Sequence, residues 1–146
     1  MSWQAASDQL IRDVLSTSRV IAMVGASPNP ARDSNDVMAF LLSRGYQVIP
    51  VNPTAAGQEI HGRRVVTSLT EIAEVVDIVD IFRNSGAAAE AVDEAVAIGA
   101  KAVWLQLGVI NEEAAARAEG AGLKVIMDRC PKIEIPRLGI AGPPRP

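Results

Sequence analysis

Short runs of aliphatic residues alternate along this chain with segments in which apolar residues recur every three or four positions. A nearly continuous apolar run of this length is typical of a strand that is buried on both faces of a parallel sheet. The chain therefore predicts a sheet of about five strands. The runs lie at 20–24, 46–51, 77–82, 102–107 and 123–127.

Four other segments place their apolar residues on one helical face, and three of them end in glycine. The first is predicted to form an N-terminal helix over about residues 3–16. Asp33 or Ser34 can cap the second helix and Asn111 the last, because short polar side chains accept hydrogen bonds from the first turn of a helix.

Strands that alternate with helices predict an α/β fold, here a Rossmann-like, doubly wound and mostly parallel sheet with helices on both faces. A chain of 146 residues suffices for one domain with its own core, which we expect to span residues 1–138. Residues 139–146 form a tail rich in proline and glycine. The stretch from residue 128 onward is expected to wrap around the domain or trail from it rather than join the sheet.

Composition narrows the classes of function. Apolar residues make up 49% of the chain and aromatic residues 3%, which predicts a core of small aliphatic side chains. With a net charge of −3 and no long basic run, we expect no nucleic-acid partner. The N-terminal segment resembles neither a signal peptide nor a membrane anchor, so we expect a cytoplasmic protein without a membrane partner. A single cysteine excludes an internal disulfide and a thiolate zinc cluster, and we expect no metal.

The loop after the first predicted strand is the strongest candidate for a ligand site. Where such a loop enters a helix, unpaired N–H groups and the positive end of the helix dipole both favour phosphate. Doubly wound sheets also bind ligands outside the carboxyl ends of their strands, and this rule points to the same loop. It also makes Gln106 and Gly108 candidate site residues, because they lie near the carboxyl end of the strand predicted at 102–107. The loop contains a glycine turn, three side-chain donors and a cation, namely Gly25, Ser27, Asn29, Ser34 and Arg32.

Two familiar phosphate-binding patterns are absent from this loop. The dinucleotide fingerprint G-x-G-x-x-G keeps only its first glycine, Gly25. No acidic residue lies between Gly45 and Gln58 to bind a ribose 2′-hydroxyl. A Walker-type loop is also absent, because no Gly-Lys-Ser/Thr follows Gly25. These features argue against NAD and against ATP hydrolysis.

Several motifs, in order along the chain, resemble those of one family. They are similar to the small, stand-alone CoA-binding domain proteins, which in turn resemble the N-terminal CoA-binding domain of the succinyl-CoA synthetase α subunit. Motifs in the right order are far more specific than any one of them. They are Val24 to Pro28, Ser34-Asn35, Gly45 to Pro53, DIVDIFRNS at 77–85, WLQLGV at 104–109, NEEAA at 111–115 and DRCPKIEIPRL at 128–138.

This resemblance implies a Rossmann-like fold that binds coenzyme A (CoA). By the same resemblance, the loop after the first strand would hold the CoA phosphates. Two residues after the second strand would flank the nucleotide portion, and three residues at 82–84 would form the opposite wall. Among these, Arg83 can pair with a phosphate as a bidentate donor. The residues are Gly25, Ala26, Ser27, Pro28, Asn29, Arg32 and Ser34, then Asn52 and Pro53, and then Phe82, Arg83 and Asn84.

The chain departs from the synthetase in its chemistry. It ends where the synthetase continues into a second domain, so the histidine phosphorylated there has no counterpart, and we interpret the sole histidine, His61, as an ordinary loop residue. Asp77 and Asp80 face opposite sides of a strand and are poor partners for acid–base chemistry. We therefore expect no catalytic residue. The predicted function is non-catalytic binding of CoA or a short acyl-CoA, as a carrier, sensor or regulatory protein.

Three alternatives remain open at this point. An NAD(P)-type oxidoreductase, or another small metabolic enzyme, would use the same fold. An interaction module would dock its proline-rich tail on a partner. Finally, Cys130 is either a small residue packed under the C-terminal segment, the interpretation that we favour, or a thiol that Arg129 and Lys132 activate for a mixed disulfide with CoA.

Overall fold

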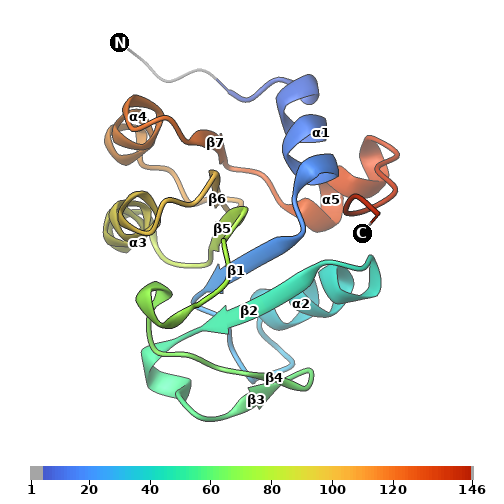
Figure 1. The fold of residues 1–146 in the computed structure, drawn as a ribbon, viewed down its shortest axis with the longest axis vertical. Helices are drawn as coiled ribbons and strands as arrows, with labels where there is room; N and C mark the ends of the chain where they lie inside the picture. Colours follow the sequence, from blue (N-terminus) through green and yellow to red (C-terminus); the bar gives the residue numbers. More distant parts are fainter. Residues whose placement is uncertain (1–4, 146) are drawn as a thin grey trace.

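The predicted apolar runs all form strands of one parallel sheet in the computed structural model, which describes residues 5–145 (Figure 1). The first strand has the predicted bounds, and the others are shorter than predicted by a residue or two. The Rossmann-like α/β fold is therefore confirmed. The strands are β1 (Val20–Val24), β2 (Gln47–Val51), β5 (Ile78–Ile81), β6 (Ala102–Leu105) and β7 (Lys124–Met127), in the spatial order β2-β1-β5-β6-β7.

Helices cover both faces of the sheet (Figure 1). Successive side chains of a strand point to opposite faces, so each strand contributes to two separate cores. On β1, Met23 packs in the first core and Ala22 in the second. The first core is covered by α1 (Asp8–Thr17), α2 (Asp33–Ser43) and α5 (Pro131–Arg137), and the second by α3 (Ser85–Ala97) and α4 (Glu112–Gly120).

The connection between β2 and β5 is built from very short elements. It contains the 3-10 turns η1 (Pro53–Ala55) and η2 (Leu69–Glu71), and a small hairpin of β3 (Glu59–Ile60) and β4 (Arg63–Arg64). After the hairpin, Val66 forms an isolated bridge with the end of β2. No helix in residues 5–145 is long and apolar enough to cross a membrane.

The N-terminal helix begins later than predicted. It starts at Asp8, and Ser7 caps it by accepting a hydrogen bond from the N–H of Leu10 at 3.1 Å. Serine strongly prefers the cap position, so the helix begins directly after Ser7. The apolar spacing alone extends the helix back to about residue 3. The prediction is wrong for residues 5–7, and Trp3 lies outside the described residues.

The C-terminal segment contains a helix, α5, that its prolines led us to overlook. Pro131 occupies the first helical position, where the missing N–H costs nothing, and Pro136 lies at the other end. Beyond α5, Ile140 is buried in the first core. The carbonyl of Pro144 accepts a hydrogen bond from the guanidinium of Arg19, which precedes β1. The tail thus packs at the end of the sheet where β1 begins.

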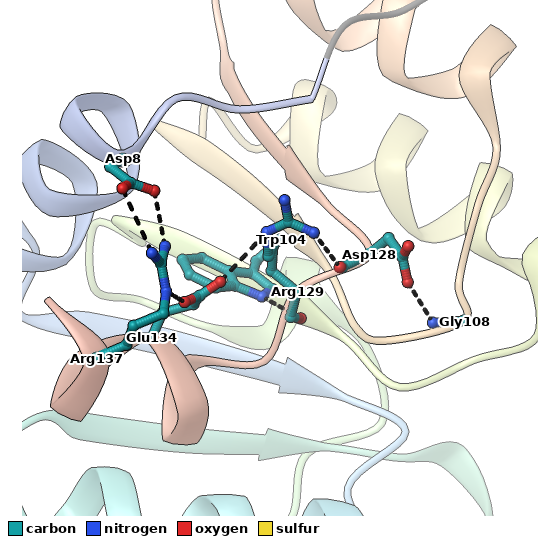
Figure 2. Close-up of polar contacts among 7 residues, drawn as sticks. All are labelled: Asp8, Trp104, Gly108, Asp128, Arg129, Glu134 and Arg137. Atoms are coloured by element: carbon teal, nitrogen blue, oxygen red, sulfur yellow. Dashed lines mark hydrogen bonds and ion pairs between the residues drawn. The ribbon is translucent and has the colours of Figure 1, made fainter.

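A buried carboxylate holds α5 against α1 (Figure 2). Glu134 pairs with Arg137 on its own helix and with Arg129, whose Nε lies 3.2 Å from Glu134 Oε1. Arg137 also binds Asp8 on α1, with 2.7 Å between Nη2 and Oδ1, and this hydrogen bond lowers the pKa of Asp8. The carbonyl of Arg129 accepts a hydrogen bond from Trp104 Nε1 at 2.8 Å. Because a buried charge is costly unless it is paired, this network fixes the position of α5.

One carboxyl group inside the sheet has no partner. Asp80 of β5 lies in register between Met23 of β1 and Trp104 of β6, and it is only 1% exposed. Neither of its carboxyl oxygens has a hydrogen-bond partner among the described residues. Burial therefore raises the pKa of Asp80 well above its ordinary value.

Replacing Asp80 with asparagine should change how stability depends on pH. Because the pKa is higher in the folded state, the folded protein binds more protons than the unfolded chain between the two pKa values. The free energy of unfolding of the wild type should fall as pH rises through that range, relative to Asp80→Asn, by at most about 1.4 kcal/mol per pH unit. Urea unfolding from about pH 4 to about pH 8 measures the difference. Parallel profiles would contradict it.

Asp77 offers a control of opposite sign. Burial raises the pKa of Asp77. Hydrogen bonds from the N–H groups of Val20 and Arg19, at 3.0 and 2.8 Å, together with Lys101, lower this pKa by a larger amount, so the net shift is downward. Its contribution to stability is present above the unfolded pKa and is lost as pH falls. On acidification, the wild type should therefore lose stability relative to Asp77→Asn. Relative to Asp80→Asn, the wild type should gain stability on acidification.

Candidate functional site

The carboxyl ends of the parallel strands meet at one edge of the sheet, and the segments that leave them enclose a cleft of about 900 Å³. The strand order reverses there, because β1 lies between β2 on one side and β5 on the other. Doubly wound sheets bind their ligands at such a reversal. Each of the five strands supplies lining residues through the segment that follows it.

Most residues that the sequence predicted for the site line this cleft. Those that do not are Ala26, which is buried, and Pro28, Asn29, Pro53 and Gly108, which are exposed outside it. For all of the predicted residues, a part in ligand binding stays a prediction. The predicted residues that line it are Gly25, Ser27, Arg32, Ser34, Asn52, Phe82, Arg83, Asn84 and Gln106.

Gly25 allows the loop after β1 to cross the end of β5 closely. Its φ is +84°, a left-handed conformation that favours glycine, and a Cβ atom there would lie 2.1 Å from the carbonyl oxygen of Phe82. The N–H of Gly25 donates to the carbonyl of Val51 at 2.9 Å, and the N–H of Phe82 donates to that of Val24 at 2.8 Å. The ends of β2, β1 and β5 are thus joined at the point of reversal.

Polar side chains fix the backbone of this loop. Ser34 Oγ accepts a hydrogen bond from the N–H of Ser27 at 3.1 Å, and Asn35 Nδ2 donates to the carbonyl of Ser27 at 3.0 Å. His61 Nε2 lies 2.9 Å from Asn35 Oδ1 and 3.0 Å from the carbonyl oxygen of Asn35, so it acts as a donor. His61 therefore supports the loop through Asn35. The sequence prediction included Asn35 in a family motif but not among the site residues, although a polar residue at a buried helical position is a usable signal.

The amino end of α2 lacks a side-chain cap. Arg32 occupies the cap position, so Asp33 and Ser34, which the sequence predicted as caps, lie inside the helix. Within residues 5–145, the N–H groups of Asp33 and Ser34 form no hydrogen bond. These N–H groups are therefore available to an anion, and Asp33 and Asp36 in the same turn offset part of the helix dipole. Side chains do cap α1, α3 and α4, through Ser7, Asn84 and Asn111.

Three cations and two carboxylates line the cleft. Lys132 of α5 pairs with Asp36 of α2, which offsets the charge of one of the two carboxylates. Arg32 and Arg83 form no ion pair within the described part of the chain. Two guanidinium groups thus remain available beside the uncapped helix.

Asn52, which follows β2, is already committed to hydrogen bonds within the protein. Its Nδ2 donates to the carbonyl of Ala26 at 2.8 Å. Its Oδ1 accepts from the N–H of Thr54 at 3.0 Å and from Thr54 Oγ1 at 2.8 Å. The side chain therefore joins β2 to the loop after β1 and offers no free acceptor for a ribose hydroxyl.

Another part of the cleft, which we call the apolar side, is formed by Leu107 and Val109 after β6 and by Cys130 and Ile133 at the start of α5. Cys130 is buried, as the favoured interpretation of the sequence predicts, yet it lies at the cleft wall.

A residue outside the lining joins the two segments of the apolar side (Figure 2). Asp128, with φ +61°, accepts a hydrogen bond from the N–H of Gly108 at 2.8 Å through Oδ1. Its carbonyl accepts another from Arg129 Nη1 at 3.0 Å. Gly108 thus helps to position the wall by its backbone.

Gln106 brings an unpaired amide to the cleft. Its side chain is 6% exposed, and its Oε1 has no hydrogen-bond donor among the described residues. Buried polar groups are nearly always hydrogen-bonded, so an amide without a partner at a cleft wall is a candidate ligand contact.

Fold and cleft together define a Rossmann-like α/β binding domain with a candidate anion site at its strand-order reversal. Residues 19–136 match the sequence model of the family described as CoA binding domain. The chain therefore belongs to the CoA-binding domain family.

Comparison with known proteins agrees with this membership. The chain is 39% identical over 130 residues to the uncharacterized protein YneT of Bacillus subtilis (strain 168), covering 89% of this chain and 95% of YneT. A hypothetical protein from Pyrococcus horikoshii OT3 superposes with a TM-score of 0.87 at 39% identity, covering 94% and 98% of the two chains. The apo dinucleotide-forming acetyl-coenzyme A synthetase 1 of Ca. Korarchaeum cryptofilum gives 0.68 at 25% identity, over 81% of this chain and 28% of that one. The resemblance to CoA-binding domain proteins is confirmed.

Gly25→Ala should disrupt the junction of the strand ends. The added methyl group would lie against a backbone oxygen that β5 holds in place, so we expect a loss of at least about 3 kcal/mol in the free energy of unfolding. Gly57→Ala is the matched control, because Gly57 has a similar φ of +81° but open space around it. It should lose only about 1–2 kcal/mol, the cost of the backbone conformation. Equal losses in urea unfolding would contradict the role of the Phe82 contact.

Proposed function

We propose that this chain binds coenzyme A or a short acyl-CoA in the cleft, and that it does so without catalysing a reaction. Membership of the CoA-binding domain family supports CoA binding. The observation that carries the proposal is the convergence, at the strand-order reversal, of the uncapped end of α2 with the unpaired Arg32 and Arg83. Helix N–H groups and bidentate guanidinium donors favour a ligand that carries several phosphates, as CoA does.

The end of β2 favours CoA over a dinucleotide. NAD-binding domains place an acidic residue there to bind the ribose 2′-hydroxyl. Here the residue is Asn52, and both ends of its amide are engaged with Ala26 and Thr54. CoA carries a 3′-phosphate on its ribose, which a carboxylate at this place would repel.

His61, Asp77 and Asp80 supply no catalytic group to the cleft, which supports binding without catalysis. The chain has one histidine, His61, and its Nε2 is engaged with Asn35 outside the cleft lining. Asp80 is buried without a partner, and Asp77 binds backbone N–H groups at the opposite end of β5. A cytoplasmic carrier, sensor or regulatory protein for CoA metabolism is the role that we propose.

Calorimetric titration with CoA, acetyl-CoA, NAD, NADP and ATP tests this proposal. We expect CoA and acetyl-CoA to bind and NAD not to bind. Arg83→Gln should weaken CoA binding by about 10- to 100-fold, the effect of losing a charge-assisted hydrogen bond. Arg63→Gln, which removes an exposed arginine outside the cleft, should leave it unchanged. Tight NAD binding without CoA binding would overturn the proposal.

Gln106→Leu should separate affinity from stability. Leucine has a similar size and removes a buried amide that lacks a partner, so the free energy of unfolding should rise by about 1 kcal/mol. CoA affinity should fall by about fivefold or more, because the ligand loses an amide partner. Denaturant unfolding and calorimetry measure the two quantities on the same protein. Unchanged CoA affinity would remove Gln106 from the site.

A further inference from the structure

Large apolar side chains that remain exposed gather near the cleft. Within residues 5–145, four such side chains are at least half exposed, and Leu107 and Ile133 line the cleft at 54% and 52% exposure. Ile110, 50% exposed, follows Leu107 closely in the chain but does not line the cleft, and Val75 lies elsewhere. Exposed apolar groups that cluster at a cleft mark a surface that a ligand covers.

The cleft lining therefore combines two kinds of group. The uncapped end of α2, Arg32 and Arg83 supply its anion-binding part, whereas the apolar side offers Leu107, Val109 and Ile133. Lys132, next to Ile133, pairs with Asp36 and so presents a neutralised charge. A ligand that covers both kinds of group carries charged groups and an apolar group in one molecule.

We propose that the apolar side binds an aliphatic acyl group on the CoA thiol, so that the preferred ligand is an aliphatic acyl-CoA rather than free CoA. This inference rests on the proposed function. An acyl-CoA has both, because its phosphates lie at the nucleotide end and its acyl chain at the other. An aliphatic chain would cover Leu107 and Ile133 and remove their side chains from water. A carboxylate-bearing chain would lose its hydration against the same residues.

Titration with free CoA, acetyl-CoA, butyryl-CoA, hexanoyl-CoA and succinyl-CoA tests this inference on the full-length protein. Each methylene that becomes buried should raise the affinity by up to about fourfold. Butyryl-CoA should therefore bind more tightly than acetyl-CoA and free CoA. Succinyl-CoA should bind more weakly than butyryl-CoA, although its chain has the same number of carbon atoms.

Variants of the two exposed side chains locate the effect. Leu107→Gln and Ile133→Gln should each reduce the ratio of butyryl-CoA affinity to free-CoA affinity towards one. Ile110→Gln makes the same change at an equally exposed position outside the cleft and should keep the wild-type ratio. Because all three side chains are half exposed, we expect the variants to fold, and circular dichroism checks this.

The possible outcomes separate the two proposals. If neither CoA nor any acyl-CoA binds, the proposed function fails. If CoA binds but acetyl-, butyryl- and hexanoyl-CoA bind equally well, only the acyl inference fails. A dependence on chain length that persists in both Leu107→Gln and Ile133→Gln would also overturn it, because the acyl group would then lie elsewhere.

Discussion

The close contact between Gly25 and the carbonyl of Phe82 is the constraint on which the site depends. At this point β1 is bonded to both of its neighbours, through Gly25 to Val51 and through Val24 to Phe82. The loop after β1 then enters α2, and the segment after Phe82 enters α3 on the other face of the sheet. The cleft opens between them because the strand order reverses here. A side chain at position 25 would separate the two segments that carry the anion-binding groups.

Apart from Asp80 inside the sheet, the polar groups that support the fold and those that line the cleft differ in their pairing. Glu134 of α5, which supports the fold, is paired with Arg129 and Arg137 (Figure 2). At the cleft, by contrast, Arg83 forms no ion pair and the amide oxygen of Gln106 has no hydrogen-bond partner within the described residues. An unpaired buried amide costs stability, and a ligand that supplies its partner recovers that cost. The ligand-free protein is therefore less stable than it would be if the amide of Gln106 had a hydrogen-bond partner.

Local sequence was sufficient for the framework. The aliphatic run of β1 has to be buried on both faces wherever it lies, and Gly25 marks its end, so strand and loop could both be predicted. The regular alternation of strands and helices then placed the loops of several strands at one edge of the sheet. Asn111 was correctly predicted as a cap because the interaction spans only the first turn of α4. Membership of the CoA-binding domain family followed from motifs in sequence order.

Contacts between distant parts of the chain were decided only by the tertiary structure. Lys132 and Asp36 are 96 positions apart, and no local pattern indicates that one offsets the other in the cleft. The same holds for His61, which supports the loop after β1 through Asn35. Helix α5 was not predicted because proline opposes helix locally, whereas the ion pair of Arg137 with Asp8 and the packing against α1 and α2, which stabilise α5, join it to distant parts of the chain. The sequence by itself thus determined the strands, the cleft's position and the family, and the tertiary structure decided which charges in the cleft remain unpaired, because pairing depends on distance in space.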